Sequence, residues 1–408
     1  MEYNTCTLHN GLRIIHLPSA SPIVYCGYEV NAGARDEDPE EAGMAHFCEH
    51  MTFKGTSRRK AWHILHYLEC VGGNLNAYTN KEETVYYATI QKEHIGRAID
   101  LLTDMTFHST YPQNEIDKEV EVICDEIEIY KDSPADLIYD EFENTIFEGH
   151  PLGHYILGEA QQIRHYTTED ALRFVHRYYR PDNAIFFVYG DVDFKKIIRL
   201  LKSATIDLCP SPSLTTNVLP VFPPYQPKEV IKDVNTHQTH VMIGNRGYGA
   251  HHPQRIALYL LNNILGGSGS TARLNVSLRE HHGLVYTVEG IMFNYCDTGV
   301  WGIYFGCDSQ DIGKCKRLVR KELDKMMEKP LTETQLRAAK KQIKGQIAVA
   351  CDNRENFALD FGKSFLHYGW KKDIAHLFQQ IDAVTADEIQ QVAQDLFVPD
   401  QLTTLIFK

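Results

Sequence analysis

The chain has 408 residues and a net charge of -13, with 43% hydrophobic and 23% charged residues. This length exceeds one ordinary hydrophobic core and suits two domains of about 200 residues each. The negative charge argues against nucleic-acid binding, because a phosphate backbone requires basic partners, so any charged partner should itself be basic. No apolar run approaches the roughly 18 residues that a membrane span needs, so we do not expect this chain to be an integral membrane protein.

The N-terminal segment and the cysteines indicate a reducing compartment. Residues 1–6 lack the basic and apolar stretches of a secretory signal and lead directly into a strand-like run. The ten cysteines are scattered without a CxxC pair, which is typical of reduced cysteines that pack as small hydrophobes. We therefore expect a cytoplasmic protein with neither a disulfide framework nor a cysteine zinc site.

Strand-like and helical patterns alternate along the chain. In the first half, the predicted elements in chain order are a strand at 23–30, a strand at 84–90, a helix at 114–131, a helix at 168–179 and a strand at 184–189. In the second half they are a strand at 240–244, a helix at 253–265, a strand at 284–293 and helices at 311–329 and 332–350. This order favours the α+β class over a doubly wound parallel sheet.

A stretch rich in proline, serine and threonine at 209–228 predicts a linker between two domains, 1–208 and 229–408. The two halves resemble each other. In each, a strand leads into a helix that opens at a proline, Pro39 in the first half and Pro253 in the second. The sequence therefore predicts two similar domains, each a mostly antiparallel sheet covered by helices, related as a degenerate internal repeat.

The segment 46–50 reads HFCEH and lies where a helix is predicted, because Asp38 can cap the helix and Pro39 suits its first position. Histidines four residues apart share one helix face, so both imidazoles can reach one metal ion. Glu49 stands beside them, close enough to hold a water. This is the HxxEH order of some zinc peptidases, but the pattern also fits an amphipathic helix whose histidines make ordinary hydrogen bonds.

A catalytic zinc site of this kind needs a third protein ligand and one position left for water. The acid-rich helix at 115–128 offers several carboxylates. Glu119 and Glu126 are seven residues apart and so lie on one helix face to within roughly 20°. One could bind the metal while the other supports it, but acidic residues on a helix are often only a solvated face, and composition does not choose between them.

Further blocks follow the HFCEH segment in order along the chain. They are the surrounding run at 33–56, GNLNAYT at 73–79, the paired acids within 119–126, YRPDN at 179–183 with GD at 190–191, GGS at 266–268, and LRE and GLVY within 278–286. Together they closely resemble the metallopeptidase family of pitrilysin, insulin-degrading enzyme and the mitochondrial processing peptidase. The resemblance covers nearly the whole chain.

The resemblance implies a zinc-dependent endopeptidase that hydrolyses unfolded peptides. By this similarity His46, His50 and Glu126 would bind Zn²⁺, Glu49 would be the general base that activates zinc-bound water, and Glu119 would support the metal site. Two imidazoles and one carboxylate leave the ion a net positive charge, which lowers the pKa of a bound water to roughly 7.

Two further groups of residues are implied by the same resemblance. Arg279 and Tyr286 resemble a pair that holds substrate and steadies the tetrahedral intermediate, since a guanidinium and a phenol are both donors. Either could also be an ordinary surface or core residue. Asn76, Ala77 and Tyr78 resemble an edge strand that pairs with extended substrate, which reads backbone and tolerates many side chains.

The resemblance also bears on assembly. Long members of the family carry a zinc half and an Arg/Tyr half in one polypeptide, so one zinc motif and one Arg/Tyr pair in this chain imply a homodimer with shared sites. Two alternatives remain. One is a non-catalytic peptide-binding scaffold, such as the respiratory-complex core proteins, although these typically lose parts of the metal motif that is complete here. The other is the catalytic subunit of a heterodimeric processing peptidase, which need not carry both Arg279 and Tyr286.

Overall fold

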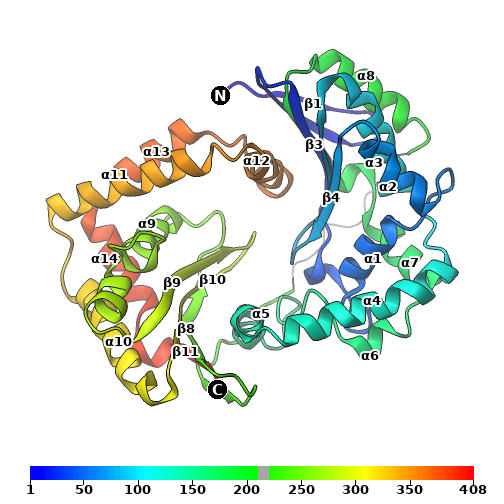
Figure 1. Ribbon diagram of the computed structural model, residues 1–408. Helices are drawn as coiled ribbons and strands as arrows, with labels where there is room; N and C mark the ends of the chain where they lie inside the picture. Colours follow the sequence, from blue (N-terminus) through cyan, green and yellow to red (C-terminus); the bar gives the residue numbers. More distant parts are fainter. Residues whose placement is uncertain (210–219) are drawn as a thin grey trace. The chain divides into compact units, whose positions relative to one another are not determined.

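The computed structural model describes residues 1–209 and 220–408, which fall into two compact units (Figure 1). The first unit comprises Met1–Glu128, His154–Pro220 and Cys351–Asp373, and the second comprises Ile129–Gly153, Val221–Ala350 and Ile374–Lys408. The domains expected from the sequence are contiguous, whereas each unit of the structure includes one segment from the other half of the chain. Residues 210–219 of the expected linker lie outside the described part.

The first unit is built on a six-stranded sheet with the strand order β1-β2-β6-β3-β5-β4. Its strands are β1 (Asn4–Thr7), β2 (Arg13–Pro18), β3 (Ile23–Val30), β4 (Asn74–Thr79), β5 (Thr84–Gln91) and β6 (Ala184–Gly190). Only β2 and β6 pair in parallel, and the other neighbours are antiparallel. The sheet is therefore mostly antiparallel, as the sequence predicts.

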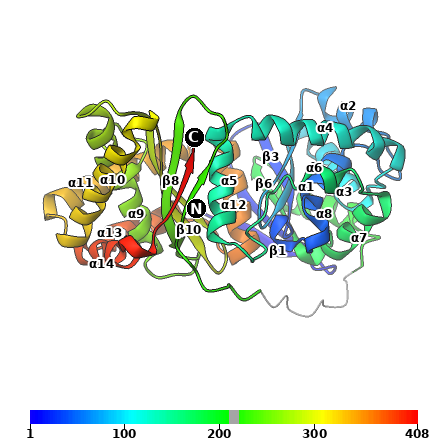
Figure 2. The ribbon, with the colours of Figure 1, turned by 90° about the horizontal axis from the view of Figure 1, so that it is seen from below.

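Helices cover both faces of this sheet. They are α1 (Met44–Thr52), α2 (Ala61–Glu69), α3 (Ile95–His108), α4 (Gln113–Lys131), α6 (Ala160–Ile163), α7 (Thr168–Tyr178), α8 (Phe194–Ala204) and α12 (Arg354–Tyr368). Alternate residues of β3 point to opposite faces. Val24, Cys26 and Tyr28 join the core beneath α1 and α3, while Glu29 lies against Gly362 of α12. Figure 2 shows α12 on one side of β3 and β6 and α1, α3 and α7 on the other.

The second unit has a five-stranded sheet with the order β7-β11-β8-β10-β9. Its strands are β7 (Glu229–Lys232), β8 (Thr239–Gly247), β9 (Val285–Asn294), β10 (Gly299–Cys307) and β11 (Thr403–Phe407), and its helices are α5 (Pro134–Ile146), α9 (Arg255–Gly266), α10 (Ile312–Glu328), α11 (Glu333–Ala350), α13 (Ile374–Ala383) and α14 (Ala386–Leu396). The ring of Phe142 from α5 packs over Gly244 and Gly302, where a larger side chain would not fit. Trp301, on the opposite face, packs on Phe397 just after α14.

The two sheets share one topology. The order β7-β11-β8-β10-β9 repeats β2-β6-β3-β5-β4, including a single parallel pair at the same place. Each sheet is covered on one face by helices of its own half and on the other by a helix from the other half, α12 in the first unit and α5 in the second. The predicted α+β class and the degenerate internal repeat are confirmed.

The helix that carries HFCEH begins later than the sequence predicts. Instead of one helix from Pro39, the structure has a short 3-10 turn over Pro39–Glu41, and α1 begins at Met44. Gly43 lies between them with a φ of +87°, a left-handed conformation that glycine adopts at least cost. The backbone therefore leaves the helical path at Gly43. In the second half, α9 likewise begins at Arg255 rather than at Pro253.

Within residues 1–209 and 220–408, no helix combines the length and the apolar character that crossing a bilayer requires.

Candidate metal centre

Three side chains predicted as zinc ligands lie together in the first unit. His46 and His50 project from α1 and Glu126 from α4, and one ligand atom of each lies within 4.8 Å of the other two. Glu126 Oε2 is 3.2 Å from His50 Nε2 and 3.8 Å from His46 Nε2. The two helices therefore bring a pair of imidazoles and a carboxylate to one point.

Glu119 orients one of these histidines. Its Oε1 lies 3.1 Å from His50 Nδ1, and its Oε2 lies 2.5 Å from Nζ of Lys54. A carboxylate that accepts a hydrogen bond from Nδ1 keeps the proton on that nitrogen. Nε2, which faces Glu126, is then the atom left to bind a metal. Burial raises the pKa of Glu119, but His50 and Lys54 outweigh it and lower the pKa below its ordinary value. Glu119 is therefore an anion beside His50, and it is the residue that the family resemblance implies as a support for the metal site.

The two histidines differ in their electrostatic surroundings. Burial, and then the nearby His50, lower the pKa of His46 to about 4, so its imidazole is neutral. Burial also lowers the pKa of His50, but Glu119 and Glu126 more than compensate and raise it to about 9. Without a metal, His50 thus carries a proton that pairs with Glu126. A bound cation would replace this proton, because a metal-ligating imidazole is neutral.

The residues present fit a zinc ion. His46 Nε2 lies 3.8 Å from Glu126 Oε2, beyond hydrogen-bond distance, and this neutral imidazole can present that nitrogen to a cation. Two imidazoles and one carboxylate are a donor set that zinc prefers in catalytic sites, where a fourth position stays open. His46, His50 and Glu126 would hold the ion.

Glu49 precedes His50 on α1, but it is not one of the three residues whose ligand atoms converge. It is half-buried on α1, and Thr79 donates a hydrogen bond from Oγ1 to Glu49 Oε2 at 2.6 Å. Burial raises the pKa of Glu49, and the hydrogen bond from Thr79 opposes that rise. A partly desolvated carboxylate beside a metal site is suited to accept a proton.

The start of α1 is fixed by a side chain from outside the helix. Glu37 accepts hydrogen bonds from the backbone N–H groups of Gly43 and Ala45, both at 2.8 Å. These are among the donors that a helix start leaves without an intrahelical partner. His154 Nε2 lies 2.9 Å from Glu37 Oε2 and steadies the carboxylate. Glu37 therefore sets the position from which the two histidines project.

The sequence reasoning assigned no role to Thr79, Lys54 or Glu37. Glu37 and Lys54 stand inside the run of residues on which the family resemblance depends, and Thr79 ends the GNLNAYT block. Their positions in these blocks are the feature of the sequence that could have indicated a role at the site. Their partners, however, are on other elements or across a loop, so local spacing does not reveal them.

The predicted substrate strand is β4, which lies at the edge of the first unit's sheet. Its residues alternate between the two faces. Asn76 donates to the hydroxyl of Tyr87 at 3.2 Å, whereas Ala77 packs against the core. The backbone N–H of Ala77 donates to Asn76 Oδ1 at 2.9 Å, and Tyr78 stacks edge-on against Tyr87.

Arg279 and Tyr286 lie together in the second unit. Arg279 is on a π-helical turn, Asn275–Glu280, and Tyr286 is near the start of β9 with 80% of its surface exposed. The guanidinium carbon of Arg279 is 5.6 Å from the centre of the Tyr286 ring, a cation-π arrangement. The structure thus brings these two predicted residues into contact with each other.

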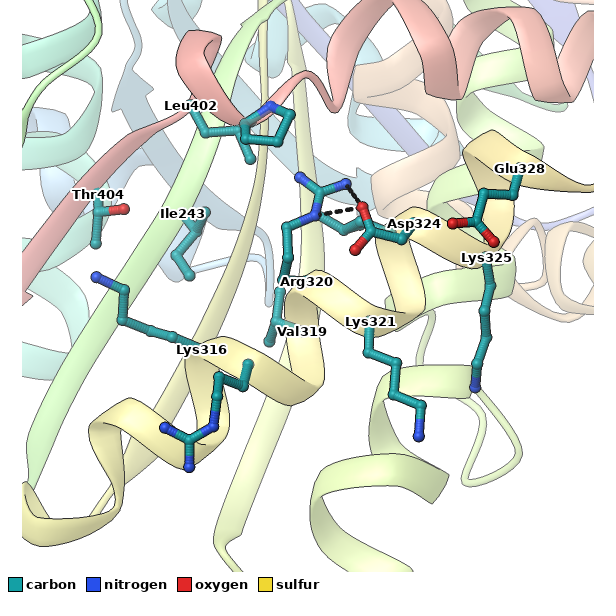
Figure 3. Close-up of a pocket in the computed structure, with 13 residues that line it drawn as sticks. Ile243, Lys316, Val319, Arg320, Lys321, Asp324, Lys325, Glu328, Leu402 and Thr404 are labelled. Carbon is teal, nitrogen blue, oxygen red and sulfur yellow. Dashed lines mark hydrogen bonds and ion pairs between the residues drawn. The ribbon is translucent and has the colours of Figure 1, made fainter.

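A cavity of about 640 Å³ lies elsewhere in the second unit, along α10 (Figure 3). Ile243 and Thr404 form part of its wall, and Arg320 lies at its centre, paired with Asp324 at 2.7 Å. It contains none of the residues that the sequence assigns to catalysis or substrate binding.

Comparison with known proteins matches both halves of the chain to one peptidase family. Residues 14–160 match the family described as "Insulinase (Peptidase family M16)", and residues 165–343 match "Peptidase M16 inactive domain". A Bacillus subtilis protein named "Uncharacterized zinc protease YmxG" is 31% identical over 402 residues, which cover 98% of this chain and 97% of that protein. The chain therefore belongs to peptidase family M16, whose relatives of this length are named as zinc proteases.

Solved structures show the same two-domain fold. A protease from Helicobacter pylori superimposes with a TM-score of 0.90 at 23% identity, covering 100% of this chain and 99% of its own. A Pseudomonas fluorescens protein titled as a "peptidase M16 inactive domain" superimposes with a TM-score of 0.91 at 18% identity, covering 100% and 98%. The fold is thus that of M16 peptidase-like proteins.

Proposed function

We propose that this protein is a zinc-dependent endopeptidase that hydrolyses unfolded peptides. The observation that carries the proposal is the convergence of His46, His50 and Glu126 within 4.8 Å, with Glu49 beside them. The match of residues 14–160 to the insulinase description and the zinc-protease names of relatives support it. The complete metal motif counts against a purely non-catalytic scaffold.

The chain's own residues have distinct parts in this chemistry. A bound zinc ion would supply a Lewis acid that polarises the scissile carbonyl and acidifies a water. Glu49 would take the proton from that water and deliver it to the leaving amine. Glu119, held by Lys54 at 2.5 Å, would keep the His50 ring in the orientation that presents Nε2.

The substrate would add as a further strand beside β4, the last strand of its sheet in the described part of the chain, through backbone hydrogen bonds that any sequence offers. The net charge of -13 favours basic peptides over acidic ones through long-range attraction. We expect faster cleavage of short basic peptides than of matched acidic peptides at low salt. Equal rates for the two peptides would contradict the electrostatic part of this proposal.

The proposed active form is a two-fold homodimer, in which the zinc site of one subunit works with Arg279 and Tyr286 of the other. Mixing inactive His46→Ala and inactive Arg279→Ala proteins under exchange conditions tests it. One site of a mixed dimer then combines intact residues, so random exchange should restore about a quarter of wild-type activity. Proven exchange without recovery would mean that each site is built within one chain.

The catalytic proposal is tested with Glu49→Gln. The purified wild-type protein should hold about one zinc per chain and cleave unfolded peptides in a chelator-sensitive manner. Glu49→Gln should keep its zinc and lose nearly all turnover, because the proton acceptor is gone while the ligands remain. A variant that loses its metal would show Glu49 to be a ligand. A metal-free wild-type protein that cleaves at full rate would refute the zinc mechanism.

A further inference from the structure

Thr79 donates a short hydrogen bond to Glu49, the proposed general base. Its hydroxyl has one proton and two neighbouring oxygens, Glu49 Oε2 at 2.6 Å and Thr84 Oγ1 at 3.5 Å. Thr84 does not compete strongly as an acceptor, because its Oγ1 lies at the limit of hydrogen-bond distance and a neutral hydroxyl accepts more weakly than a carboxylate. The Thr79 proton therefore goes to the carboxylate.

The position of Thr79 gives this contact a second meaning. It is the last residue of β4, the edge strand on which we propose that substrate is added. Along a strand, every second side chain points to the same face, so Thr79 shares the face of Ala77, which packs against the core that includes α1. The backbone of Thr79 is thus part of the proposed substrate-binding strand, and its side chain is hydrogen-bonded to the proposed general base, Glu49.

We infer that Thr79 is a positioning residue, which holds the Glu49 carboxylate in a fixed orientation and links it to the substrate strand. This inference rests on the proposed function. With Oε2 of Glu49 engaged by the threonine, Oε1 is the oxygen left to take a proton. Without the hydroxyl, the half-buried carboxylate loses its fixed donor and rotates among several orientations, few of which are productive.

Kinetics of three variants test this role. Thr79→Val keeps the shape of the side chain and removes the hydroxyl, so kcat should fall about 10- to 100-fold. KM should stay unchanged, because the backbone of β4 still offers the same edge. Thr79→Ser retains the hydroxyl and should restore most of kcat. Thr84→Val is the matched control, since it deletes a hydroxyl at the residue paired with Thr79, one that bonds to a backbone carbonyl instead of Glu49.

The kinetic outcomes separate a positioning role from a structural one. A loss of kcat in Thr84→Val equal to that in Thr79→Val would overturn the inference, because a general packing defect would then explain both. A rise in KM with unchanged kcat would overturn it too, since the threonine would act only on substrate binding. Failure of Thr79→Ser to recover activity would likewise overturn it, because the hydroxyl would then not be the group that matters.

A second measurement does not depend on activity. In chelator-treated protein shown to be free of zinc, thermal unfolding is compared for wild type, Thr79→Val, Glu49→Leu and the double variant. Thr79→Val should lower Tm clearly in the wild-type background and much less beside Glu49→Leu, because the partner is already absent. Equal shifts in both backgrounds would refute the hydrogen bond itself. An inactive wild-type protein that still shows this coupling would refute the proposed function alone.

Discussion

Replacing Glu119 with glutamine should weaken zinc binding without removing any ligand atom. In the structure Glu119 contacts His50 Nδ1 at 3.1 Å and Lys54 Nζ at 2.5 Å, and only 11% of its side-chain surface is exposed. A glutamine keeps the size but loses the charge, so the His50 ring becomes less basic and Lys54 is left without its anion. Losing such a supporting carboxylate typically costs 10- to 100-fold in metal affinity, or about 1.4 to 2.8 kcal/mol. We expect a loss within that range here, because the Glu119 side chain is largely covered while His50 and Lys54 remain partly exposed.

The assay is competition for zinc against a chromophoric chelator at fixed pH and salt, which yields a dissociation constant for each variant. Glu121→Gln is the matched control, because it makes the same change on the same helix at a side chain that is 64% exposed and pairs only with Arg164 among the described residues. Its zinc affinity should stay within about 2-fold of wild type, since exposed ion pairs contribute little. An unchanged affinity in Glu119→Gln, or an equal loss in both variants, would refute the orienting role of Glu119.

Three further outcomes are expected. Gly43→Ala should destabilise the protein by about 1 to 3 kcal/mol in denaturant unfolding, because its φ is +87° and an added Cβ would lie 2.8 Å from the backbone of Gly158; a neutral effect would contradict the strain at the start of α1. Burial raises the pKa of Glu83, but Lys363 and His367 outweigh it and hold that pKa at about 2, below its ordinary 4.5. This lowered pKa adds about 3 kcal/mol to the free energy of unfolding, a contribution that is present above pH 4.5 and is lost as pH falls towards 2. Glu83→Gln should therefore be less stable than wild type at pH 7. Its free energy of unfolding should also fall less steeply between pH 4.5 and pH 2. Zinc in excess of its dissociation constant should raise Tm in a concentration-dependent way, and a chelator should reverse the rise.

Much of the fold could be predicted from the sequence because its elements have clear periodicity. The strand at 23–30 coincides with β3, and the helix at 332–350 differs from α11 by one residue. The convergence of His46, His50 and Glu126 was also predicted, because helix geometry places the histidines on one face and the family resemblance selects the third ligand. The resemblance, rather than spacing, made that last choice.

Other features depend on contacts that local patterns do not encode. The helix at 354–368, α12, is not among the elements predicted from the sequence, and its local pattern does not show that it covers the sheet of the first unit. The delayed start of α1 depends on Gly43 and on Glu37, which caps the helix from outside. The hydrogen bond from Thr79 to Glu49 joins a strand to a helix and is visible only when both are in place.

The placement of α12 in the first unit has a consequence for the order of synthesis. Phe361 of α12 is fully buried and packs against Phe187 and Tyr189 of β6, with ring centres 6.2 Å apart in both pairs. A ribosome delivers β6 long before it delivers α12. Until residue 373 has emerged, the nascent first unit exposes an aromatic sheet face to solvent, a surface of the kind that chaperones recognise. The unit that carries the zinc motif therefore completes its folding only after residues 351–373 have been synthesised.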